Sequence, residues 1–96
     1  MTFEVSSQAA QWYIDELRLK EGDSIKFFGK VYGTRSGFSF AIAKETATDP
    51  YKVVTIQGVN FYIEKTDEWF FQDIDLTVGM DPELNEPTFI YEEKSQ

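Results

Sequence analysis

Carboxylates are the main groups available for chemistry in this chain, because its 96 residues include no cysteine and no histidine. The thiolate and imidazole ligands that soft and borderline metals prefer are missing, and so are the usual nucleophile–base pairs of covalent catalysis. Asp73 and Asp75 lie two residues apart, which places both on one side of a strand if both belong to it. Three more acids follow at Asp81, Glu83 and Glu86. Oxygen ligands of this kind suit hard cations such as calcium or magnesium.

The acidic stretch does not follow the calcium-loop template. Counting from Asp73, Val78 occupies the position of the obligatory glycine and Leu84 that of the terminal glutamate. Solvated turn acids explain the stretch better. A catalytic pair of carboxylates would need one pKa raised by burial, and no spacing here indicates that. We therefore expect a non-enzymatic protein with no catalytic residue, metal ligand or cofactor. Binding of a hard cation or ferrous iron by carboxylates is the alternative function.

A glycine loop, Gly33-Thr34-Arg35-Ser36-Gly37, brackets one cation and two hydroxyls with two glycines. Glycine permits positive φ, so backbone amides there can converge on an anion, and the fork of Arg35 suits a carboxylate or phosphate. The lysine and spacing of a phosphate-binding P-loop are missing. A flexible hairpin loop is the simpler interpretation.

Trp69, Phe70 and Phe71 are consecutive aromatic residues in an otherwise polar segment. They cannot all point inward from one short helix, so the sequence predicts that one of them is exposed. Exposed aromatic side chains often mark a protein-binding surface. Core packing accounts for most of the other aromatic residues.

Two periodicities predict the elements that position these residues. Apolar residues at Ala10, Tyr13, Ile14 and Leu17 predict a helix that Ser6 or Ser7 caps. Alternation predicts strands at 2–5, 24–32, 37–44, 52–57, 59–64, 74–80 and 88–91, and residues 65–72 read as one or two helical turns. Residues 92–96 read as a loose tail. The prediction is one domain over residues 1–96, mainly β (α+β by content), a compact sandwich or pseudo-barrel of about seven strands with an N-terminal helix.

The net charge is −8, and residues 64–96 carry all of the excess, with ten acids and two lysines. This charge argues against nucleic acid and anionic membranes as partners. A protein partner remains compatible, and the sequence leaves a homodimer open. The chain shows no secretory leader and no apolar run of membrane-spanning length, and the lack of cysteine suits a reducing compartment. We expect a cytoplasmic protein.

The order of these segments resembles the HesB family, the A-type iron–sulfur carriers. The resemblance rests on Phe3-Glu4-Val5-Ser6-Ser7-Gln8-Ala9-Ala10, on the glycine loop followed by Phe38, on Gly58-Val59, and on Leu84-Asn85-Glu86 before Phe89. It implies a HesB-like fold and, by descent, an accessory role beside an iron–sulfur assembly component. The three cluster-ligating cysteines of that family are absent, with Arg35 at the first position and residues 92–96 at the other two. Cluster binding by thiolates is therefore not expected.

The family's site lies between the glycine loop and the C-terminal segment, which selects the candidate partner-binding residues. An ion pair between Arg35 and Glu92 or Glu93 would take the place of the lost metal bridge. An unrelated small β binding module is the further alternative. The candidate partner-binding residues are Arg35, Ser36, Trp69, Glu92 and Glu93.

Overall fold

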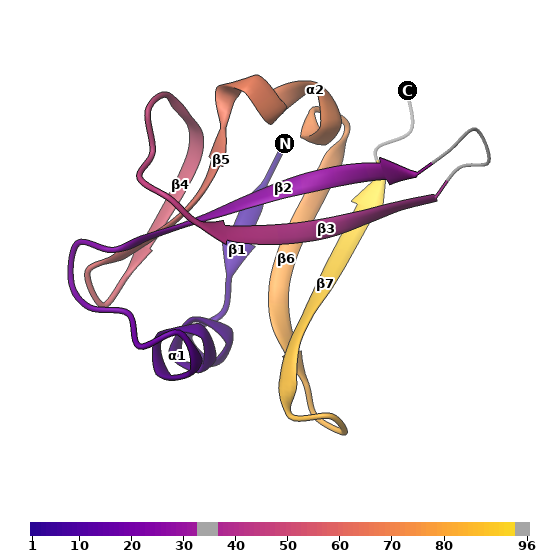
Figure 1. Ribbon diagram of the computed structural model, residues 1–96. Helices are drawn as coiled ribbons and strands as arrows, with labels where there is room; N and C mark the ends of the chain where they lie inside the picture. Colours follow the sequence, from indigo (N-terminus) through magenta and orange to yellow (C-terminus); the bar gives the residue numbers. More distant parts are fainter. Residues whose placement is uncertain (33–36, 94–96) are drawn as a thin grey trace.

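A computed structural model describes residues 1–32 and 37–93, which form two β-sheets packed on each other with a helix at one end (Figure 1). The fold prediction of a mainly β chain with seven strands and an N-terminal helix is confirmed. The elements are β1 (Phe3–Val5), α1 (Ser7–Glu16), β2 (Ser24–Tyr32), β3 (Gly37–Lys44), β4 (Pro50–Ile56), β5 (Val59–Glu64), a 3-10 turn η1 (Lys65–Asp67), α2 (Glu68–Phe71), β6 (Ile74–Asp81) and β7 (Glu86–Glu93).

The strands divide into a three-stranded sheet A, in the order β1-β6-β7, and a four-stranded sheet B, in the order β3-β2-β5-β4. Neighbouring hairpins account for the antiparallel pairs β2–β3, β4–β5 and β6–β7. The pairs β1–β6 and β2–β5 are parallel and join segments that lie far apart in the sequence. Strands β3 and β7 are both edge strands, and β3 crosses in front of β6 and β7 in the view of Figure 1.

Helix α1 begins where the sequence predicts. Ser6 is its N-cap, and the Ser6 hydroxyl accepts a 3.0 Å hydrogen bond from the Ala9 amide. Ala9, Ala10 and Tyr13 are buried against the sheets. Burial raises the pKa of Tyr13 to about 12. Leu17 follows the last helical residue and is 40% exposed, so the prediction that it continues the apolar face is wrong.

The core lies between the two sheets and is rich in aromatic rings. Phe27 packs edge-on against Phe3 at 5.5 Å and Tyr13 at 6.0 Å between ring centroids. Val59, Phe61 and Ile63 point inward from β5 and are buried, as their alternation predicts. Burying these large side chains supplies most of the folding free energy, at roughly 1.5–3 kcal/mol for each.

The turn between β4 and β5 is a two-residue hairpin at Gln57 and Gly58, as predicted. Both residues have positive φ, 53° and 77°. Two successive left-handed residues match the type I′ turn that suits the twist of antiparallel strands.

The last strand is longer than predicted. Strand β7 runs from Glu86 to Glu93, so Glu92 and Glu93 belong to a strand and not to a loose tail. Pairing with β6 explains the difference, because Glu92 lies opposite Asp75 and Glu93 opposite Ile74 in the ladder. Residues 94–96 lie outside the described part of the chain. Among the described residues, no helix has the length and apolar character needed to cross a membrane.

Candidate functional site

The four residues of α2 point in different directions, because successive side chains around a helical turn are about 100° apart. Phe71 is fully buried in the core, and Phe70 is half-buried beside it. Trp69 is 64% exposed. The prediction that one of the three consecutive aromatic residues is exposed is confirmed, and the exposed one is Trp69.

Phe70 anchors α2 to sheet B. Its ring occupies the space over Gly29 of β2, where a Cβ atom would lie 2.3 Å from the ring carbons. Gly29 lies two residues after the buried Phe27 in β2, so both residues face the same side of the sheet. The contact with Phe70 is therefore on the inner face. The absence of a side chain at Gly29 therefore lets the helix approach the strand and fixes the direction of Trp69.

Rings from three elements are joined by a series of contacts. Phe40 of β3 lies 5.9 Å from Phe70 and 5.4 Å from Tyr91 of β7, and Trp69 lies 5.8 Å from Phe70, between centroids. These residues belong to α2 and to the two edge strands β3 and β7. We call Phe40, Trp69, Phe70 and Tyr91 the aromatic patch. Tyr91 is 44% exposed, so two of its four rings face solvent over much of their surface.

The structure brings part of the predicted site together. Glu92 and Glu93 directly follow Tyr91 and are exposed. Because side chains alternate along a strand, Glu93 lies on the same face of β7 as Tyr91 and Glu92 on the other face. Arg35 and Ser36 lie outside the described residues, and so does any ion pair between Arg35 and Glu92 or Glu93. Sequence reasoning did not include Phe40 and Tyr91 in the site. Their alternation predicts strand residues, but it does not show that β3 and β7 are edge strands that meet.

The acidic residues of the C-terminal third spread along the β6–β7 hairpin. Asp81 holds the turn, because one of its carboxylate oxygens accepts hydrogen bonds from the amides of Glu83 and Leu84. No group of three or more metal-ligating side chains occurs in the described part of the chain.

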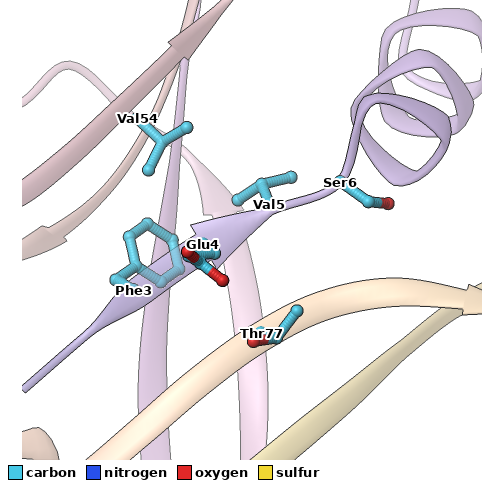
Figure 2. A pocket seen from close by; sticks show the side chains of 6 residues that line it. All are labelled: Phe3, Glu4, Val5, Ser6, Val54 and Thr77. Carbon is cyan, nitrogen blue, oxygen red and sulfur yellow. The ribbon is translucent and has the colours of Figure 1, made fainter.

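A cavity of about 360 Å³ lies elsewhere, between β1 and β4. Its lining comes from β1 and Ser6, from Val54 of β4 and from Thr77 of β6 (Figure 2). Phe3 and Val5 belong to the buried core, so the cavity is a gap at the junction of two sheet edges. The charged group in its lining is Glu4. Ser6 and Thr77 supply its other polar groups, and Phe3, Val5 and Val54 make the rest of its lining apolar.

Comparison with known proteins finds relatives that match this chain over most of its length. The chain is 33% identical, over 96% of its own length and 100% of the relative, to the Bacillus subtilis protein named pyruvate dehydrogenase inhibitor. The chain belongs to the family of this inhibitor. It also matches uncharacterized proteins of Staphylococcus saprophyticus (28% identity over 93% of this chain and 97% of the relative) and Staphylococcus epidermidis (31% over 81% and 86%). No family model matches.

This relationship corrects the resemblance to the HesB family, which is wrong as an assignment. A match across the full length names an inhibitor of pyruvate dehydrogenase, and none of the relatives carries an iron–sulfur name. The segments that suggested HesB are a strand followed by a helix cap, glycine turns and a hairpin start. Many small β proteins need such residues for local backbone reasons. The relative's name describes an inhibitor and not an enzyme, which agrees with the expectation of a non-enzymatic chain.

Proposed function

We propose that this protein inhibits pyruvate dehydrogenase by binding one of its protein components. The observation that carries the proposal is the 33% identity to the Bacillus subtilis inhibitor over the whole of that protein. The aligned region covers the residues of the core, of both sheets and of α2. The proposal includes the cytoplasmic location expected from the cysteine-free sequence.

The aromatic patch is the surface that we assign to this interaction. Aromatic side chains supply most of the binding energy at many protein interfaces, because they bury a large area and lose little conformational freedom. Trp69 and Tyr91 are already held by ring contacts with Phe70 and Phe40, so little ordering is needed on binding. This function does not require a catalytic cleft in the protein, because an inhibitor of this kind acts by occupying a surface of its target.

The test is an inhibition assay with the purified pyruvate dehydrogenase complex of the organism that encodes this chain. The rate of pyruvate-dependent NADH formation should fall as the protein is added, and the Bacillus subtilis inhibitor with its own complex serves as the positive control. Replacing Trp69 with Ala should raise the half-inhibitory concentration at least about tenfold, because truncating a central interface aromatic typically costs 2 kcal/mol or more.

Leu84→Ala is the matched control for Trp69→Ala. Leu84 is 66% exposed, almost as much as Trp69, but it lies in the turn between β6 and β7, at the opposite end of sheet A (Figure 1). It should leave inhibition unchanged. Equal effects of the two variants would remove the aromatic patch from the proposal, and an unaffected rate at a large excess of wild-type protein would remove the function itself.

A further inference from the structure

Acidic side chains flank both exposed members of the aromatic patch. Glu68 precedes Trp69 in α2, and Glu92 and Glu93 follow Tyr91 in β7. In the part of the chain that the structure describes, the salt bridges are Lys26–Glu45 and Lys44–Asp23, so none of these three carboxylates belongs to one. Within the described residues, no salt bridge neutralises their charges.

The charge around the patch belongs to a larger division between the two sheets. The strands of sheet A contain six acids and no base, whereas those of sheet B contain four lysines and one acid. The sheet A acids are Glu4, Asp75, Asp81, Glu86, Glu92 and Glu93. Residues 64–93 carry ten acids, and Lys65 is their one base. The described strands of sheet A thus carry a net negative charge, which attracts cations and repels phosphates.

We propose that the aromatic patch binds an arginine-bearing segment of the partner protein. A guanidinium group matches both features of the surface. Its plane stacks on the faces of tryptophan and tyrosine, and its N–H fork pairs with carboxylates in a bidentate manner. Trp69 and Tyr91 supply the faces, and Glu68 and Glu93 supply the carboxylates, while Glu92 on the other face of β7 adds to the negative charge. The inference rests on the proposed function for the identity of the partner, but not for the chemistry of the segment.

Direct binding tests this chemistry without the enzyme. The probe is a capped hexapeptide of alternating arginine and leucine, and its counterpart carries glutamate in place of arginine. With ¹⁵N-labelled protein, the arginine peptide should shift the Trp69 indole signal and the amides of Tyr91, Glu92 and Glu93, and the glutamate peptide should shift none of them. Equal shifts with both peptides, no shift, or shifts centred on another surface would overturn the inference.

A pair of variants tests the role of charge. The double change Glu92→Gln and Glu93→Gln keeps the size of both side chains. It should weaken arginine-peptide binding at least about threefold, because the charge-assisted contact of Glu93 becomes neutral and the negative charge at this end of β7 falls. The matched control is Glu86→Gln at the other end of the same strand, which should leave the affinity unchanged. If the two variants bind the peptide equally well, the carboxylates beside Tyr91 have no such role and the inference is wrong.

The inhibition assay separates this inference from the proposed function. In one outcome, the double variant still inhibits the enzyme and the wild-type protein does not bind the arginine peptide. This result would retain the proposed function and reject the arginine-bearing segment. Peptide binding at Trp69 without any inhibition would retain the chemistry of the patch and reject pyruvate dehydrogenase as the target. A double variant that loses both peptide binding and inhibition supports both, provided that Glu86→Gln keeps both.

Discussion

Glu64 is a buried carboxylate that holds the loop between β3 and β4 against sheet B. The Thr48 hydroxyl donates a 2.7 Å hydrogen bond to one of its oxygens, and the Thr48 amide donates a 3.1 Å bond to the other. The Asp49 amide adds longer bonds of 3.3 Å. These donors, with the Thr48 hydroxyl first, lower the pKa of Glu64 despite its burial. The ionised carboxylate is therefore part of the native structure of this loop.

The first prediction concerns the pH dependence that Glu64 creates. Because its pKa is lower in the folded chain, the stability it contributes is present above its unfolded value of 4.5 and is lost as pH falls through the folded value. Glu64→Gln should lower the free energy of unfolding at pH 7, since the amide cannot accept as many hydrogen bonds. Urea unfolding at pH 7 and below pH 4 should show the difference from wild type shrinking in acid. A difference that stays constant with pH would contradict this role.

The position of α2 depends on a missing side chain in a neighbouring strand. Phe70 fills the space over Gly29, and the ladder between β2 and β3 holds Gly29 opposite Phe40, so a side chain at this position would have to displace the Phe70 ring. Gly79 of β6 provides a contrast. A Cβ atom there would meet the Ile90 side chain at an ordinary distance of 3.5 Å.

Gly29→Ala should therefore displace Phe70 and, with it, Trp69. The expected loss of stability is about 1–3 kcal/mol, typical of an overpacked interior, and inhibition should weaken because the aromatic patch is disturbed. Gly79→Ala should cause little change in either. Adding Phe70→Leu to Gly29→Ala should recover part of the stability by restoring space. Thermal unfolding and the Trp69 indole shift measure both effects, and an unshifted indole in Gly29→Ala would contradict the coupling.

Alternation in the sequence predicts which residues form strands, but not which strands become neighbours. The hairpins follow from turn residues such as Gln57-Gly58, and the buried face of β5 follows from Val59, Phe61 and Ile63. The parallel pairs β1–β6 and β2–β5 leave no local signal, since they depend on packing between distant segments. The site shares this limit. Trp69 can be found from three consecutive aromatic residues, whereas Phe40 and Tyr91 join it because two sheet edges meet.

Charge is distributed over the whole molecule by sheet, and in sheet A this brings like charges together. Asp81 lies directly opposite Glu86, and Asp75 lies opposite Glu92, in the β6–β7 ladder. Side chains in such positions are about 5 Å apart at their Cβ atoms, so two carboxylates repel. Repulsion of this kind lowers stability while keeping a negative surface, which the proposed binding of a cationic segment uses.

Relieving one of these pairs should stabilise the protein. Glu86→Lys converts the contact with Asp81 from repulsion to attraction, which should add about 0.2–1 kcal/mol and raise Tm by about 1–8 °C at low ionic strength. In 1 M salt the gain should largely disappear, because the screening length falls to about 3 Å. Glu83→Lys is the control, since it changes the net charge equally from the turn, outside the paired ladder. If both variants raised Tm equally, net charge and not the facing pair would set the effect, and the pairwise account of sheet A would be wrong.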